Sequence, residues 1–307
     1  MSEEKIKKRA HELGFELAGI TSAQPIEKTH INHFEQWLNR NFCGPLEYMT
    51  KNLDKRTHPG VLLPDARSVI CVGLRYEPLS NRHPDTKIAS YALYEEYHPF
   101  IKTRLHQLAA YIESLLPRSA DWKFKAAVDS APLAEKTLAR RAGLGFIGRN
   151  HILTHPKYGG CILLGELITT LDLAPDQPLD TAHCGSCDRC IRACPTGALR
   201  PDGFLDARLC LSCRTQYNSP NSHPADGRWL YGCDECLLAC PYTQNAPPIV
   251  NSQFSPFPLP ENLGARQILE WTQDTFDRTF AGSCIHRIGL QKIRENAENC
   301  LKYGKQE

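Results

Sequence analysis

Four cysteines near the middle of this chain follow one another at fixed spacings. They are Cys184, Cys187, Cys190 and Cys194, and Pro195 comes directly after the last one. In this Cys-x2-Cys-x2-Cys-x3-Cys-Pro pattern, three thiolates bind one 4Fe–4S cluster and the fourth cysteine binds a second cluster. The spacing therefore predicts a ferredoxin-like segment that carries two 4Fe–4S clusters.

A partial second copy of the pattern follows. It consists of Cys233, Cys236 and Cys240 before Pro241, without a first cysteine at the usual distance. An upstream residue must supply that ligand, and there are two candidates, Cys210 and Cys213. By the crossing rule, the first cluster takes Cys184, Cys187, Cys190 and Cys240. The second cluster takes Cys194, Cys233, Cys236 and either Cys210 or Cys213.

Zinc is the alternative metal for such a segment. A structural zinc site uses four ligands, commonly in two Cys-x2-Cys pairs, and gives no reason for a proline after the final cysteine. The pattern therefore favours iron–sulfur clusters. The remaining five cysteines are scattered along the chain, and we assign them no chemistry: Cys43, Cys71, Cys161, Cys284 and Cys300.

The composition is that of an ordinary globular protein with 307 residues, 41% of them hydrophobic, and a formal net charge of +2. The first residues do not resemble a secretory leader, and no apolar run approaches the ~18 residues that a membrane span needs. In such a chain, clustered cysteines indicate metal ligands in a reducing compartment rather than disulfides. We therefore expect a cytoplasmic protein without membrane contact. The net charge neither predicts nor excludes a nucleic-acid partner.

Helical and strand patterns alternate over the first part of the chain. The spacing predicts a helix and a strand within residues 1–22, strands at 67–74, 125–129 and 161–170, and helices at 91–116 and 132–142. This alternation predicts an α/β domain over residues 1–175. Proline-rich connections flank the cysteine segment. We therefore expect a ferredoxin-like domain at residues 176–246, and a linker with a short helical tail at residues 247–307.

Asp129 lies where a predicted strand is followed by a helix. One interpretation is an N-cap by Asp129 or Ser130, with Pro132 in the first turn. The other, which is compatible with it, is a carboxyl group at the carboxyl end of a strand, where α/β proteins bind their ligands. His98, beside Tyr97 at the start of a helix face, is interpreted as a structural histidine.

Gly143, Gly145 and Gly148 form a G-x-G-x-x-G pattern. A dinucleotide site needs a strand before this pattern and a helix after it. Here a predicted helix precedes it, so a glycine loop that lets the backbone approach another ligand is favoured.

These motifs together resemble the epoxyqueuosine reductases, cobalamin-dependent iron–sulfur enzymes that complete queuosine, a modified base at the tRNA wobble position. The resemblance rests on residues 128–135, 141–150, 165–167, the cysteine run, 231–236, 282–289, and Arg56 with 62–70. These stretches follow the family's order and cover nearly the whole chain. Two features depart from the family. The chain stops soon after residue 289, where many members carry a HEAT-like extension, and residues 214–216 replace a Thr-x-Glu segment.

The resemblance implies roles for individual residues. The proton-donating aspartate of the family falls on Asp129, and its additional cluster cysteine falls on Cys210, so that Cys210 rather than Cys213 completes the second cluster. The implied cobalamin-binding residues are Arg56, Asp129, Asn150 and Ser212. The chain has no histidine in an Asp-x-His-x-x-Gly context. This agrees with the family's base-off mode of binding cobalamin without a histidine ligand.

The implied function is the reduction of epoxyqueuosine to queuosine in tRNA by a monomer. Electrons from an external low-potential donor would pass through the clusters to cobalamin, which cycles between Co(II) and Co(I). Asp129, with a pKa raised by burial or by the substrate, would protonate the epoxide oxygen, and the tail would offer a tRNA contact. The alternatives are a corrinoid iron–sulfur reductive dehalogenase, a ferredoxin-type electron-transfer protein, and an RNA-binding module with structural clusters. The absent export signal counts against the first, and the large α/β domain counts against the second.

Overall fold

The computed structural model describes residues 2–79, 83–117, 121–179, 182–218, 228–250, 252–260 and 263–303. Four strands form the central sheet in the order β1-β2-β7-β4, and each neighbouring pair is antiparallel. The strands are β1 (Leu17–Ser22), β2 (Ser68–Arg75), β7 (Ile162–Thr169) and β4 (Phe124–Ala127). All of β2 is buried, as expected when both faces of a sheet are covered. The predicted mixed α/β class and these four strands are confirmed.

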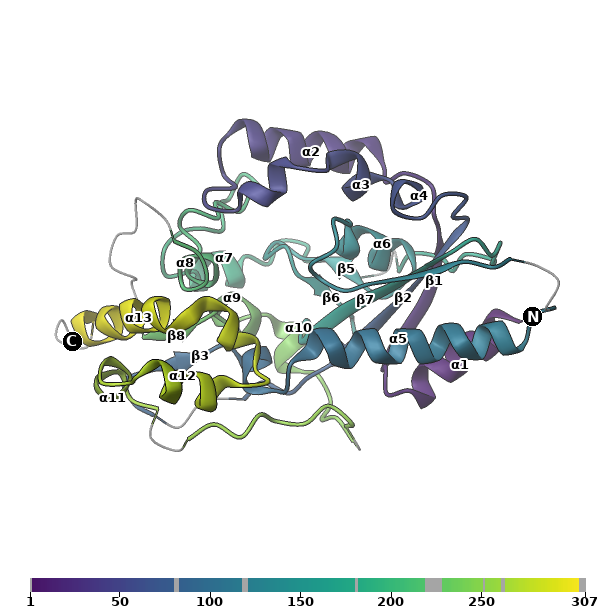
Figure 1. The fold of residues 1–307 in the computed structure, drawn as a ribbon. Coiled ribbons are helices and arrows are strands. Elements are labelled where there is room, and N and C mark those ends of the chain that lie inside the picture. The colour runs from purple at the N-terminus through teal and green to yellow at the C-terminus, as the bar shows by residue number, and fades with distance from the viewer. Residues whose placement is uncertain are drawn as a thin grey trace.

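Two helices cover one face of the sheet (Figure 1). They are α1 (Glu3–Glu12) and α5 (Tyr97–Ser114). Ile6 of α1 and Leu105 of α5 are fully buried and share one apolar core with Ile70 of β2. The helix predicted at residues 91–116 starts later because a 3-10 turn, η2 (Ser90–Leu93), comes before it.

The opposite face of the sheet is covered by α6 (Glu135–Arg141). Leu138 of α6 packs in a second core with Val69 and Ile168 of the sheet. This helix starts three residues later than predicted, with Ala134 at its N-cap position and no side-chain cap. The N-cap interpretation of Asp129 or Ser130 is therefore wrong, since tight turns separate both residues from the helix.

An arm of short helices arches over the α6 side of the sheet (Figure 1). It consists of α2 (Lys28–Asn39), η1 (Glu47–Thr50), α3 (Leu53–Thr57) and α4 (Pro59–Leu62). The indole N–H of Trp37 in α2 donates a hydrogen bond to the carbonyl oxygen of Leu205 at 2.6 Å. The arm therefore spans from the sheet to the cysteine-rich segment.

The cysteine-rich segment is built from short elements. They are α7 (Arg189–Ala193), α8 (Leu211–Arg214), β8 (Trp229–Tyr231), α9 (Glu235–Leu238) and α10 (Pro241–Gln244). β8 pairs in parallel with β3 (Lys87–Ile88) from the first part of the chain. Because a strand from the first part of the chain pairs with one from the cysteine-rich segment, the division of the chain into domains at residues 175 and 246 stays a prediction.

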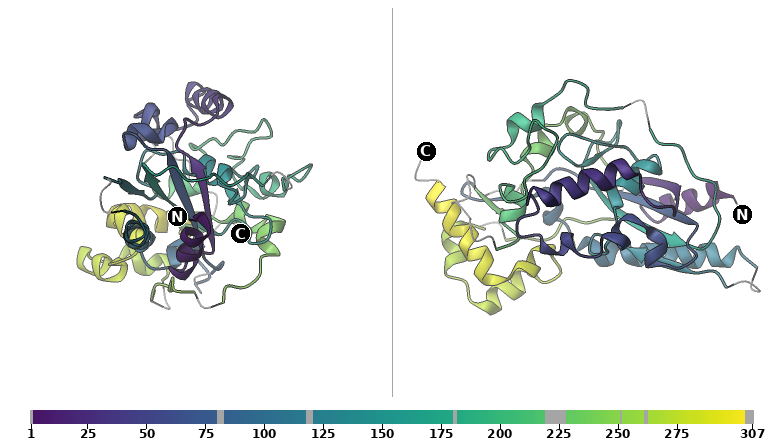
Figure 2. Two further views of the ribbon diagram at one scale, coloured as in Figure 1. Left: turned by 90° about the vertical axis from the view of Figure 1, so that its right-hand side faces the viewer. Right: turned by 90° about the horizontal axis from the view of Figure 1, so that it is seen from above.

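The last elements are helical, as predicted, and lie at the end of the molecule far from the N-terminus (Figure 2). They are α11 (Ala265–Leu269), α12 (Gln273–Phe280), η3 (Cys284–Ile288) and α13 (Gly289–Tyr303). The amide of Asn296 in α13 donates to the carbonyl oxygens of Thr215 and Leu230, both at 2.8 Å. α13 is therefore anchored directly to the cysteine-rich segment. No helix within the described ranges is long and apolar enough to span a membrane.

The glycine pattern at residues 143–148 follows α6 and continues into a small hairpin of β5 (Phe146–Ile147) and β6 (Leu153–Thr154). A Cβ atom on Gly145 would lie 2.5 Å from the carbonyl oxygen of Thr154. The glycine is therefore needed for close backbone packing in this hairpin, and the strand-before, helix-after context of a dinucleotide site is absent from this described segment.

Candidate active site

Asp129 lies two residues beyond the end of β4, in a loop that leads to α6. Its backbone adopts a left-handed conformation with φ of 48°, which Asp and Asn tolerate better than most residues. Its amide N–H donates to Oε1 of Glu135 at 2.5 Å. The Asp129 side chain is 51% exposed, so a substrate can reach it.

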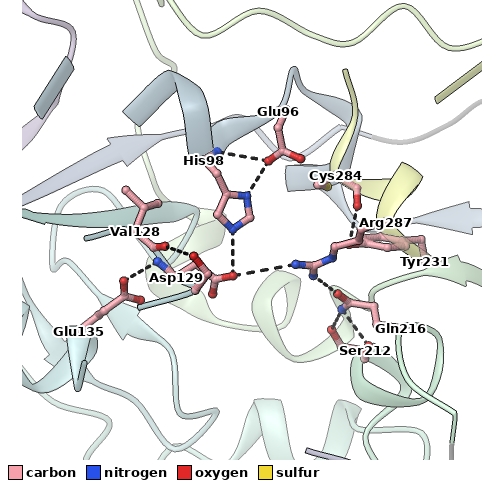
Figure 3. A network of polar contacts seen from close by, with 11 residues as sticks. Glu96, His98, Val128, Asp129, Glu135, Ser212, Gln216, Tyr231, Cys284 and Arg287 are labelled. Carbon is pink, nitrogen blue, oxygen red and sulfur yellow. Dashed lines mark hydrogen bonds and ion pairs between the residues drawn. The ribbon is translucent and has the colours of Figure 1, made fainter. Parts of the chain in front are cut away.

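His98 contacts Asp129 from the first turn of α5 (Figure 3). Its Nε2 lies 3.1 Å from Oδ2 of Asp129, and its Nδ1 lies 2.6 Å from Oε1 of Glu96. Glu96 is the N-cap residue of α5 and also accepts the amide N–H of His98. His98 is thus held between two carboxylates. The interpretation of His98 as only a structural histidine missed this contact, because no local pattern links it to a residue 31 positions away.

A cation from the C-terminal region completes the surroundings of Asp129. Nη1 of Arg287, in η3, lies 4.0 Å from Oδ2 of Asp129. Its other terminal nitrogen donates to the side-chain oxygen of Gln216, and Gln216 donates to the Ser212 hydroxyl at 3.2 Å. Figure 3 shows this chain of contacts running from Asp129 to α8. The tail therefore reaches the candidate catalytic residue directly, and the cysteine-rich segment holds the arginine that does so.

The charges around Asp129 decide which group holds a proton. Burial raises the pKa of Asp129, but the hydrogen bond and charge of His98 and the charge of Arg287 outweigh this, so the pKa lies below its ordinary value. Burial lowers the pKa of His98, but the hydrogen bonds and charges of Asp129 and Glu96 raise it to about 9. The expected net rise in the pKa of Asp129 is therefore wrong for this structure, because its charged neighbours outweigh burial. At neutral pH the proton lies on His98.

The cysteines of the predicted clusters gather in two groups. In the first, burial and the nearby charges of Cys184 and Cys240 raise the pKa of Cys190. The amide of Cys187 donates to the carbonyl oxygen of Cys184 at 3.0 Å. Cys240, the last cysteine of the partial copy, is thus close enough to Cys190 of the run to shift its pKa. This is the arrangement that the crossing rule requires, and the full ligand assignment stays a prediction.

In the second group, burial raises the pKa of Cys236, and the charges of Cys233, Cys210 and Cys194 raise it further, with Cys190 of the first group as the last contributor. Cys213 is 8% exposed, and its pKa is raised to about 12 by burial and by Cys210. The other charge acting on Cys213 is that of Lys292. This arrangement favours Cys210 over Cys213 as the remaining ligand of the second cluster. Within the described ranges no three His, Cys, Asp or Glu side chains are arranged as ligands of a single metal ion, and the thiols form these two looser groups instead.

Comparison with known proteins assigns the family. Residues 56–130 match the family model described as "Epoxyqueuosine reductase QueG, DUF1730", and residues 183–243 match a "4Fe-4S double cluster binding domain". An epoxyqueuosine reductase of Pseudomonas aeruginosa is 33% identical over 302 residues, covering 95% of this chain and 82% of the relative. This chain belongs to the epoxyqueuosine reductase family. Its cysteine-rich segment is accordingly a double 4Fe–4S domain, and the zinc alternative is set aside.

Two solved epoxyqueuosine reductases show the same fold. One is a crystal structure with an epoxyqueuosine-modified tRNA-Tyr stem loop, with 27% identity and a TM-score of 0.87 over 99% of this chain and 81% of that one. The other is from Bacillus subtilis, with its catalytic aspartate loop swung out of the active site. It has 27% identity and a TM-score of 0.84 over 99% of this chain and 82% of that one.

A cavity of about 910 Å³ lies under the helical arm of this family member. It is lined by Phe34 and Trp37 of α2, by Arg56, by Glu135 at the start of α6, and by Cys184. Although α2 carries apolar side chains, none of its residues is buried, because its apolar side faces this space. The volume and mainly apolar lining are those of a pocket for a large organic cofactor. The cavity also connects the first group of thiols with the residues next to Asp129.

The structure separates the four residues predicted to bind cobalamin. Arg56 lines the cavity, and its carbonyl oxygen accepts the amide N–H of Ala134 at 3.0 Å, which ties α3 to the Asp129 loop. Asn150 is buried, and its side chain lies 3.5 Å from the carbonyl oxygen of Cys236. Ser212 lies on the Arg287 side of Asp129. Of these residues, Arg56 alone is in the lining of this cavity.

Proposed function

We propose that this chain reduces epoxyqueuosine to queuosine in tRNA, and that it does so in the cytoplasm as a monomer. The observation that carries the proposal is its 33% identity, over 95% of its length, to a protein named epoxyqueuosine reductase. The similar fold of a reductase solved with an epoxyqueuosine-modified tRNA stem loop supports tRNA as the substrate. The net reaction consumes two electrons and two protons, converts the epoxide to an alkene, and releases its oxygen as water.

The two groups of thiols would hold the clusters. The first cluster would be bound by Cys184, Cys187, Cys190 and Cys240, and the second by Cys194, Cys210, Cys233 and Cys236. The amide of Arg149 donates to Sγ of Cys184 at 3.4 Å, and hydrogen bonds of this kind adjust the reduction potential of a cluster. An external low-potential donor would deliver the electrons.

The cavity under the arm fits cobalamin because it is large, mainly apolar and open between Cys184 and the Asp129 loop. Arg56, which lines the cavity, would hold the cofactor there. Asp129, Asn150 and Ser212 lie outside this lining, so their proposed contacts with the cofactor rest on the resemblance alone. When bound, the clusters supply single electrons and cobalamin supplies a strong reductant for the epoxide.

Asp129 would protonate the epoxide oxygen, and His98 would supply the proton. The pKa of His98 is about 9, so His98 carries a proton at neutral pH, and its Nε2 faces Oδ2 of Asp129. A bound substrate excludes water and so disfavours the separated charges of this pair. The proton then moves from Nε2 of His98 to Asp129 and on to the oxygen. A loop that swings, as in the Bacillus subtilis relative, would let the substrate enter.

The test uses anaerobically reconstituted protein, epoxyqueuosine-containing tRNA and a strong reductant, with and without cobalamin. Mass spectrometry of the digested nucleosides should show the loss of one oxygen only with cobalamin. No conversion by protein with a full iron content would contradict the proposal. That result would favour an electron-transfer protein or a reductive dehalogenase.

A further inference from the structure

Two acidic residues, Glu135 and Glu166, lie beneath the Asp129 loop. Glu166 is at the centre of the sheet on β7, opposite Cys71 of β2 and Ala127 of β4. Its side chain is on the face covered by α6, whose first residue is Glu135. Glu166 is 0% exposed, and neither of its carboxylate oxygens has a hydrogen bond of standard geometry to a described residue. Burying a carboxyl group in this way is costly.

Glu135 joins this buried group to the loop above it. Its Oε1 accepts the amide N–H of Asp129. Its carboxyl group is close enough to that of Glu166 for each to shift the pKa of the other. The loop itself is held by short local contacts, such as the amide of Ser130 to the carbonyl oxygen of Val128 at 2.5 Å. The bond to Glu135 therefore fixes the amide of Asp129, the residue of this loop that has a left-handed backbone.

We propose that Glu135 and Glu166 share one proton, and that Glu135 positions the Asp129 loop through its hydrogen bond to the Asp129 amide. This inference rests on the proposed function and adds a positioning residue to the same site. The shared proton removes the repulsion between the buried carboxylate of Glu166 and the partly buried one of Glu135. It also gives Glu166 the hydrogen-bond partner that its burial requires.

The electrostatics agree with a shared proton. Burial and the charge of Asp129 raise the pKa of Glu135 to about 7, and burial and Glu135 raise that of Glu166 well above its ordinary value. Lys136 on α6 favours the ionised form of Glu135, and Arg56 on α3 is close enough to interact with it. On the sheet, Cys71 faces the pair as a buried thiol whose pKa burial raises well above its ordinary value.

The two forms of Glu135 hold the loop with different strength. When ionised, Glu135 accepts the Asp129 amide through a charge-assisted hydrogen bond, which is stronger than a neutral one. Protonation of Glu135 weakens that bond. The Asp129 loop should therefore be held more firmly above about pH 7 than below it.

The first experiment needs no substrate and compares Glu135→Gln with Glu135→Ala in the full reconstituted chain. The glutamine keeps a carbonyl acceptor for the Asp129 amide, and the alanine does not. Hydrogen exchange of the peptide containing Asp129, read by mass spectrometry, should be about tenfold faster in Glu135→Ala than in Glu135→Gln. In the wild type this exchange should slow as pH rises through about 7, after correction for intrinsic exchange. Equal exchange in the two variants would overturn the inference.

The shared proton is tested by infrared spectroscopy at neutral pH. The wild type should show the band of a buried protonated carboxyl group, and Glu166→Gln should lose it. Glu16→Gln is the control, because Glu16 is, like Glu135, a partly buried carboxylate that accepts a backbone amide, that of Arg75 at 2.8 Å, away from this site. A band that persists in Glu166→Gln would contradict the proton assignment.

Kinetics connect the pair to the reaction. Glu135→Ala should lower kcat by about 10²-fold with little change in KM, the effect of a misplaced catalytic group. Glu135→Gln should retain more activity than Glu135→Ala, and its pH–rate profile should lack the inflection near pH 7. Glu16→Gln should have the activity and the profile of the wild type. If the wild type fails to convert the tRNA, the proposed function fails, while the exchange and infrared results still decide the role of the pair.

Discussion

Asp129 is a residue whose backbone restricts the side chains that can replace it. Its φ of 48° is tolerated by asparagine, which has nearly the same shape but cannot donate a carboxyl proton. We therefore expect Asp129→Asn to fold, to keep both clusters, and to lose turnover by about 10² to 10⁴-fold, the usual contribution of a general acid. Queuosine formation measured against iron content checks this. Turnover close to that of the wild type would remove Asp129 from the mechanism.

His98 makes the reaction sensitive to alkaline pH. Because its pKa is about 9, the wild-type rate should fall as pH rises through that value. His98→Gln should have a rate about 10²-fold lower at pH 7 and should lack this alkaline decline. The pH–rate profiles of both proteins are the measurement. An unchanged profile in the variant would show that His98 is not the source of the proton.

The same histidine links pH to stability. Its pKa is raised from 6.5 to about 9 on folding, so folding favours its protonated form. The stabilisation from His98 is therefore fully present below about pH 6.5 and is lost as pH rises through about 9.

At the scale of elements, α13 depends on one buried amide. Asn296 is 3% exposed and donates to the carbonyl oxygens of Thr215 and Leu230. Asn296→Ala leaves two buried acceptors without their donor, so the free energy of unfolding should fall by about 1–3 kcal/mol. Thermal unfolding measures this change. Asn299→Ala on the same helix is the control for helix propensity, and an equal loss in both variants would contradict the anchoring role.

At the scale of the whole molecule, the two clusters depend on ligands from separate parts of the cysteine-rich segment. Cys210→Ala should remove the second cluster and about half of the iron, because it deletes one of four proposed ligands. Cys213→Ala should keep both clusters, since Cys210 and not Cys213 influences the pKa values of Cys233 and Cys236. Iron content and electron paramagnetic resonance spectra distinguish the variants. Loss of a cluster in Cys213→Ala instead would exchange the two assignments.

Much of this architecture could be predicted because its causes are local. The spacing of the run from Cys184 and of the partial copy from Cys233 is a covalent property of the chain, and it indicated two clusters. Apolar periodicity likewise located α1, β2 and β7, since burial on one or both faces leaves a regular pattern in the sequence. The starts of α5 and α6 were displaced, because turns that precede them, such as η2, leave no strong local signal.

The chemistry around Asp129 was decided by tertiary structure. His98, Glu135, Glu166 and Arg287 come from four different elements, and no local pattern marks any one of them as part of a site. Packing of α5, α6 and η3 around the end of β4 brings these charges together. A pKa depends on burial and on neighbours that are distant in sequence. The sequence by itself thus determined the metal chemistry and the layers of the fold, and only the tertiary structure decided which side chain holds the proton.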